Sequence, residues 1–157
     1  MDTSVINFLF ADDAPEKKEI TVDFFENFIK AEAYDVFVSK YVFEELLRTP
    51  DESKRNQLLR ILDDFPISNI DISETETEIG QLADQYLIHD VIPPKKVYDA
   101  LHIACTVVVK FDFLVSWNYK HLANVNRERR IIGLNYQLGY IHNFRIITPT
   151  ELTGYGT

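Results

Sequence analysis

Three acidic side chains and one amide, far apart in the sequence, have the clearest potential for chemistry. Each lies in a predicted strand, directly after one, or on a helix next to one; they are Asp2, Glu45, Asp99 and Asn118. Carboxylates gathered within about 4–6 Å raise each other's pKa values unless a cation neutralises them. Oxygen ligands favour Mg²⁺ or Mn²⁺ over zinc or copper. We therefore expect Asp2, Glu45 and Asp99 to bind one of these ions, with Asn118 completing the site.

A metal ion held by a few protein oxygens would supply a particular chemistry. Such an ion keeps several water molecules, lowers the pKa of one of them, and stabilises the charge that builds up on a phosphodiester during in-line attack. Hydrolysis of a phosphodiester bond is therefore the reaction that these residue types predict.

Short apolar segments separated by helical patterns must position these side chains. We predict strands at or beside Asp2 and over residues 36–38, 67–72, 113–116 and 144–148. We predict helices over residues 16–33, 39–47, 51–65, 73–87 and 95–110, and a last one from 118 to 134 or 138; the fourth starts at a Ser73-x-x-Glu76 capping box. Strands that alternate with helices favour an α/β fold with a central parallel sheet of about five short strands flanked by helices. Sites in such sheets form at the carboxyl ends of the strands.

Five sequence blocks extend this interpretation to a family. They are Asp2-Thr3-Ser4, Ser39 followed by Glu45-Leu46, residues 99–104 (DALHIA), residues 114–118 (LVSWN) and residues 146–152 (IITPTEL). With these blocks in this order, the chain resembles the PIN-domain ribonucleases, particularly the toxin components of type II toxin–antitoxin systems. The resemblance spans nearly the whole chain.

The resemblance implies a single PIN-like domain over residues 1–157 and a metal-dependent endoribonuclease activity. It also implies a homodimer neutralised by a small antitoxin, whose amphipathic helix would place an arginine or lysine in the acidic pocket. Asp2, Glu45 and Asp99 match the family's acids, whereas Asn118 and His121 stand where many members have acids. Only Met1 precedes Asp2, and we expect the natural start to lie further upstream. RNA phosphates would bind basic residues, for which the candidates are Lys95, Lys96, Lys120, His121, Arg127, Arg129 and Arg130.

Composition sets the outer limits. The chain has 157 residues and a formal charge of −9, yet residues 1–90 carry a balance of −13 and residues 91–157 a balance of +4. A lone cysteine, Cys105, excludes an internal disulfide and a zinc site of paired cysteines. The apolar runs are too short for a membrane helix, so we expect a cytoplasmic protein without a membrane partner.

Some of these residues have simpler interpretations. His102 is more often a buried structural histidine than a catalytic base, Trp117 more often packs in a core than stacks on a base, and Asn118 could cap a helix as well as complete a site. The main alternative is a PIN-like module that binds RNA or protein with weakened or lost catalysis. An aspartyl-phosphate phosphatase is disfavoured because Ser4, not a second acid, lies two residues after Asp2.

Overall fold

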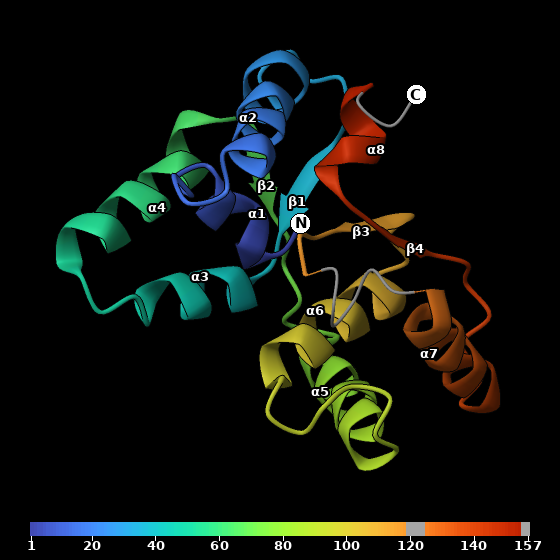
Figure 1. The fold of residues 1–157 in the computed structure, drawn as a ribbon. Helices are drawn as coiled ribbons and strands as arrows, with labels where there is room; N and C mark the ends of the chain where they lie inside the picture. The colour runs from blue at the N-terminus through green and yellow to red at the C-terminus, as the bar shows by residue number, and fades with distance from the viewer. Residues whose placement is uncertain (119–124, 155–157) are drawn as a thin grey trace. The chain divides into compact units, whose positions relative to one another are not determined.

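The computed structural model describes residues 1–118 and 125–154. It is a mixed α/β protein (Figure 1). The helices are α1 (Thr3–Phe8), α2 (Pro15–Asp23), the π-helix η1 (Phe24–Ile29), α3 (Lys40–Leu47), α4 (Glu52–Asp64), α5 (Glu76–Ile88), α6 (Val97–Val108), α7 (Val125–Gln137) and α8 (Pro149–Thr153). The strands are β1 (Val36–Val38), β2 (Ile67–Asn69), β3 (Phe113–Val115) and β4 (Arg145–Ile147).

The sheet differs from the prediction. In the described part of the chain, four three-residue strands form two separate pairs, β1–β2 and β3–β4, instead of one sheet of about five strands. β1 and β2 are parallel, with Val36 opposite Ile67 and Val38 opposite Asn69. The α/β class is confirmed, whereas a continuous central sheet is not observed.

The expected strand around Asp2 is replaced by the start of a helix. Asp2 has an extended backbone, with φ −92° and ψ 175°, and its side chain caps α1 by accepting from the backbone N–H of Ser4. Its own backbone N–H donates to the carbonyl of Val115 at the end of β3, over 3.0 Å. A strand-like contact is thus limited to one residue, because Asp and Ser side chains favour a helix start here.

The contacts of the chain group it into two compact units. The first contains Met1–Ile70, Val115–Trp117 and the described residues from Thr148 onward; the second contains Asp71–Leu114 and, after Trp117, the described residues up to Ile147. Both units combine segments that are distant in the sequence. One domain over residues 1–157 stays a prediction.

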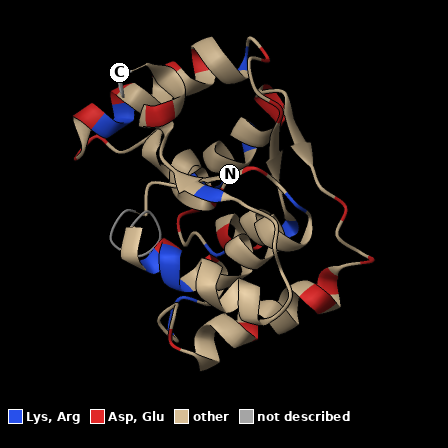
Figure 2. Cartoon of the chain, turned by 90° about the vertical axis from the view of Figure 1, so that its right-hand side faces the viewer, with Lys and Arg blue, Asp and Glu red and all other residues tan. Residues whose placement is uncertain are grey.

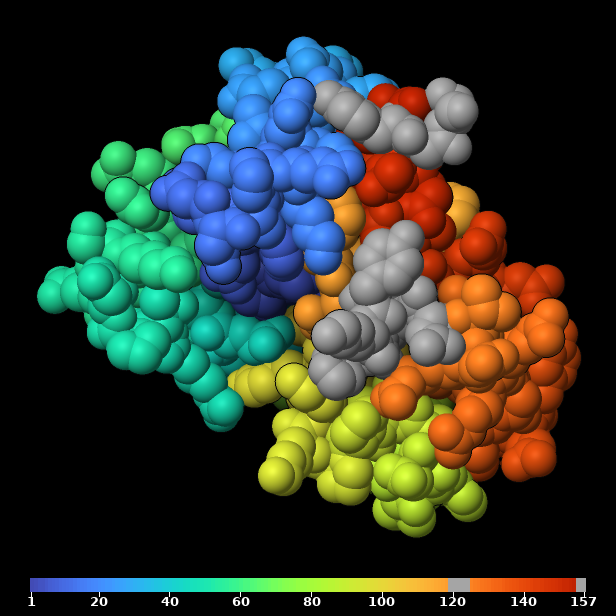
Figure 3. All heavy atoms as spheres, in the orientation of Figure 1, coloured from blue at the N-terminus to red at the C-terminus, as the bar shows by residue number. Residues whose placement is uncertain are grey.

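An apolar cluster from several elements holds the first unit together. Its fully buried members include Val5, Ile6, Phe25, Leu46 and Leu58. α1 packs against α2, α3 and α4, and α8 packs against α2 and η1. Residues of α3 and α4 form a continuous part of this unit's surface in the space-filling view (Figure 3). The position of α1, and so of Asp2 at its start, is set by this packing.

The second unit is built on the packing of α5 against α6. The buried face of α6 includes Ala100, Ile103, Ala104 and Val107, as its helical spacing predicts. Within the described residues, no helix is long and apolar enough to cross a membrane.

Candidate functional site

Asp2 is a buried carboxylate surrounded by hydrogen-bond donors of the first unit. The residue is only 1% exposed. Oδ1 accepts from the backbone N–H of Ser4 over 3.0 Å and from Ser4 Oγ over 2.5 Å, and Oδ2 accepts from Ser116 Oγ over 2.5 Å. These neutral donors fix the carboxylate and compensate in part for the burial of its charge.

Glu45 contacts Thr3, the residue that follows Asp2. It lies in the second half of α3, a helix that starts where Ser39 Oγ accepts from the backbone N–H of Tyr41. Thr3 Oγ1 donates to Glu45 Oε1 over 2.7 Å. Asp2 and Glu45, which are 43 positions apart in the sequence, are therefore connected at the start of α1 through Thr3.

Asp99 and Asn118 are in contact in the second unit. Asp99 lies in the first turn of α6 and is 8% exposed. Asn118 Nδ2 donates to Asp99 Oδ1 over 3.3 Å. The amide of Asn118 thus orients this carboxylate through its NH₂ group. The helix predicted after Asn118 is described from Val125 as α7, whereas the start that Asn118 was predicted to cap falls on residues 119–124, outside the described part of the chain.

The other predicted residues have varied positions. His102 is a buried residue of α6, 4% exposed, as its structural interpretation predicts. Trp117 is 5% exposed; its Nε1 donates to Thr21 Oγ1 over 2.8 Å and its ring lies 5.8 Å from that of Phe8. Packing rather than base stacking is therefore the role of Trp117 in the first unit.

The basic candidates belong to the second unit. Lys95, Lys96 and Arg129 are exposed, and Arg127 is half-buried. Arg130 Nη2 donates to the carbonyl of Asp90 over 3.0 Å, which ties the first turns of α7 to the loop that carries Lys95 and Lys96. The basic residues at the start of α7 form a compact group (Figure 2). Lys120 and His121 lie outside the described residues.

Taken one at a time, the predicted acids have the chemical type that hard cations bind. Within residues 1–118 and 125–154, no three His, Cys, Asp or Glu side chains are grouped so that they could hold a metal ion. The acids do supply the oxygen ligands that Mg²⁺ and Mn²⁺ take in proteins. Asp2 is the clearest case, because it is deeply buried and its described side-chain partners are all neutral.

Three hydroxyl groups around the acids were missed as site residues. Thr3 and Ser4 follow Asp2 in the sequence, and Ser116 lies at the end of a predicted strand. The signal that could have found them is the adjacency of hydroxyl residues to a helix-starting acid and to a strand end, since such residues are well placed to donate to a buried carboxylate.

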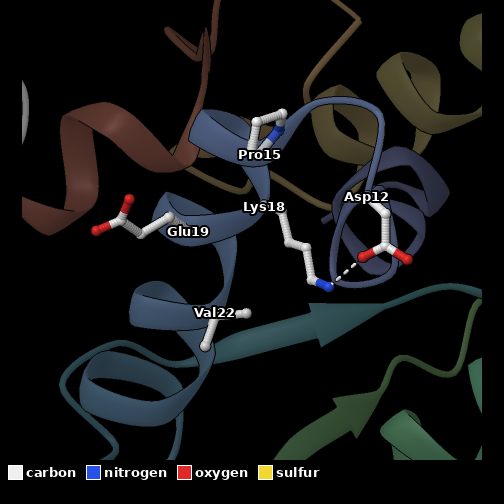
Figure 4. Close-up of a pocket in the computed structure, with 5 residues that line it drawn as sticks. All are labelled: Asp12, Pro15, Lys18, Glu19 and Val22. Carbon is white, nitrogen blue, oxygen red and sulfur yellow. Dashed lines mark hydrogen bonds and ion pairs between the residues drawn. The ribbon is translucent and has the colours of Figure 1, made fainter.

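A surface cavity of the first unit contains none of the predicted site residues. It has a volume of about 370 Å³ and is lined by Asp12, Pro15, Lys18, Glu19 and Val22 (Figure 4). Lys18 reaches toward Asp12 and forms an ion pair with it over 2.5 Å, whereas Glu19 points away. Exposed ion pairs of this kind contribute little to stability, and nothing in the lining indicates a ligand.

Comparisons of the chain with protein-family models, with curated proteins and with solved structures find no significant match.

Proposed function

We propose that the protein is a metal-dependent endoribonuclease with a PIN-like fold, the toxin of a toxin–antitoxin pair. The observation that carries the proposal is the Asp2 carboxylate, 1% exposed and held by neutral donors. A buried charge of this kind is costly unless a counter-charge accompanies it, and a divalent cation is the counter-charge that the family resemblance implies.

Asp2, Glu45 and Asp99 would hold Mg²⁺ or Mn²⁺, directly or through water. When bound, the ion supplies an activated water and stabilises charge on the phosphodiester. The hydroxyl of Thr3 orients Glu45, and the amide of Asn118 orients Asp99. The chain's own contribution is to fix the direction of these carboxylates before RNA binds.

The second unit is the better candidate for binding the RNA backbone. By sequence it contains 8 basic and 9 acidic residues, against 8 and 16 in the first unit. Glu128, the acid among the α7 arginines, accepts from the backbone N–H of Ile146 and is thereby directed to β4. Arg127, Arg129, Arg130, Lys95 and Lys96 would then contact phosphates, together with Lys120 and His121.

Cleavage by an Asp99→Asn variant tests the proposal. Structured RNAs are incubated with Mn²⁺ and either the parent or the variant, and the products are resolved by length. We expect cleavage by the parent and a loss of at least about a hundredfold in the variant, because the substitution removes a ligand charge. Asp84→Asn, an exposed acid of α5 in the same unit, is the matched control and should cleave like the parent. Equal cleavage by parent and Asp99→Asn would reject the role given to Asp99.

A binding module with weakened catalysis is the second candidate. The observation in its favour is Asn118, whose amide contacts Asp99 at a position where the resemblance leads us to expect an acid. Titration calorimetry separates the two functions: an enzyme should bind Mn²⁺ at millimolar concentration or better in an Asp99-dependent way, whereas a module without a working site should not. A homodimer and an antitoxin partner belong to the proposal through the resemblance alone. Co-expression with the product of the adjacent gene tests the antitoxin.

A further inference from the structure

The Asp2 carboxylate is held from both sides by serine hydroxyl groups. Ser4 Oγ donates to Oδ1 and Ser116 Oγ donates to Oδ2, each over 2.5 Å. Ser116 is 0% exposed, so its hydroxyl has no access to bulk water. All three residues belong to the first unit.

The two oxygens of Asp2 are not equivalent. A carboxylate oxygen offers two lone-pair sites. Oδ1 accepts two hydrogen bonds, from the backbone N–H and the Oγ of Ser4, whereas Oδ2 accepts one, from Ser116. Among the described residues, the remaining acceptor site of Asp2 is therefore on Oδ2.

A backbone N–H group fixes the position of the Ser4 hydroxyl. Ser4 Oγ accepts from the backbone N–H of Trp117 over 2.9 Å. The hydroxyl's own hydrogen goes to Asp2 Oδ1 at 2.5 Å rather than to Ser116 Oγ at 3.4 Å. Trp117 is anchored in turn by its bond to Thr21. Successive hydrogen bonds of this kind polarise one another, which strengthens the contact with the carboxylate.

We propose that Ser116 and Ser4 are positioning residues that make Asp2 a one-oxygen ligand, presenting Oδ2 to Mg²⁺ or Mn²⁺. This inference rests on the metal site of the proposed function. Ser4 occupies Oδ1, and Ser116 sets the plane of the carboxylate while leaving one site of Oδ2 for the ion.

Binding of Mn²⁺ to the full chain, measured by calorimetry, tests the proposal. We expect Ser116→Ala to weaken the affinity about ten- to a hundredfold, the usual effect of removing a group that orients a metal ligand. Ser116→Thr keeps the hydroxyl and should restore the affinity. Ser53→Ala, at an exposed serine of α4 in the same unit, should bind like the parent. Thermal melting without metal reports any structural cost of each variant separately.

The outcomes are distinct. Binding by Ser116→Ala as tight as that of the parent would overturn the proposal, and so would a parent that binds no Mn²⁺. If Ser116→Ala does not fold, Ser4→Ala replaces it, because this change removes one donor and keeps the backbone N–H; unchanged Mn²⁺ affinity in Ser4→Ala would again overturn the proposal. A parent that shows the serine-dependent binding but cleaves no RNA would contradict the endoribonuclease and leave the serine assignment supported.

Discussion

At the scale of single residues, the contact between Asn118 and Asp99 gives the amide one defined role, whereas its predicted helix-capping role involves residues 119–124, outside the described part of the chain. Asn118 Nδ2 donates to Asp99 Oδ1, so the amide stabilises a buried carboxylate where a second acid would repel it. A neutral side chain at this position lowers the negative charge available to a cation. Weaker metal binding than in a four-acid site is the expected consequence.

Replacing Asn118 by Asp should lower the stability of the chain without metal and strengthen the binding of a metal ion. Without metal, the second carboxylate next to Asp99 should lower the free energy of unfolding by about 1 kcal/mol, the equivalent of less than one pKa unit of repulsion. With Mn²⁺, the added charge should tighten binding by about tenfold. Urea unfolding and calorimetry measure the two effects. Asn143→Asp, at an exposed residue of the same unit, should show neither of them; a similar gain there would mean that overall charge, not position, is responsible.

At the scale of elements, the sequence predicts helices better than strands. Ser39 and Asp51 were predicted starts and are the capping residues of α3 and α4. The Ser73 capping box is wrong: α5 begins after Thr75, and the backbone N–H of Ser73 instead donates to Asp71 Oδ1. Asp and Ser side chains can hydrogen-bond to nearby backbone groups in more than one local arrangement, so their residue types alone do not fix where a helix starts.

Strands and site contacts depend on partners that the local sequence does not contain. β2 was predicted over residues 67–72 but ends at Asn69, since a strand lasts only as long as its neighbour does and β1 has three residues. The acids Asp2, Glu45 and Asp99 are predicted as site residues from their types and spacing, and this stays a prediction. The donors Thr3 and Ser116 were not predicted, because their role follows from contacts across 42 and 114 positions of the chain.

Two tyrosines connect elements of the second unit, and we expect them to lower the free energy of unfolding at alkaline pH. Tyr86 of α5 donates to Asn135 Oδ1 of α7 over 2.6 Å, and burial raises the pKa of Tyr86 well above its usual value. Tyr140 donates to Glu78 Oε1, and burial together with this carboxylate raises the pKa of Tyr140 to about 12. Each phenol therefore stays protonated in the folded chain at a pH where the unfolded chain has lost the proton.

The free energy of unfolding should consequently be constant up to about pH 10 with respect to these groups and should fall as the pH rises toward 12. Tyr140→Phe should make this fall less steep. Urea unfolding at pH 8, 10 and 11 gives the slope, and Tyr136→Phe, at a tyrosine of α7 that is 54% exposed, should keep the slope of the parent. An identical slope in Tyr140→Phe and the parent would contradict the assignment to Tyr140.

At the scale of the whole molecule, the proposed acids are divided between the two units. Asp2 and Glu45 belong to the first, and Asp99 with Asn118 to the second. Shared binding of one ion would link the stabilities of the two units, because a ligand that binds only the folded chain stabilises every part needed to hold it. Independent binding would not.

A double-mutant cycle on Asp2→Asn and Asp99→Asn distinguishes these cases. At a Mn²⁺ concentration about a hundred times the dissociation constant, the ion should stabilise the parent by about 2.7 kcal/mol. If one ion needs both acids, either substitution removes most of this stabilisation and the double variant loses hardly more. If two sites act separately, the losses add, as they do for distant and independent positions. Thermal and urea unfolding of the parent, the two single variants and the double variant, each with and without Mn²⁺, give the stabilisation by the ion in all four proteins. Additive losses would exclude the shared ion on which the proposed chemistry depends.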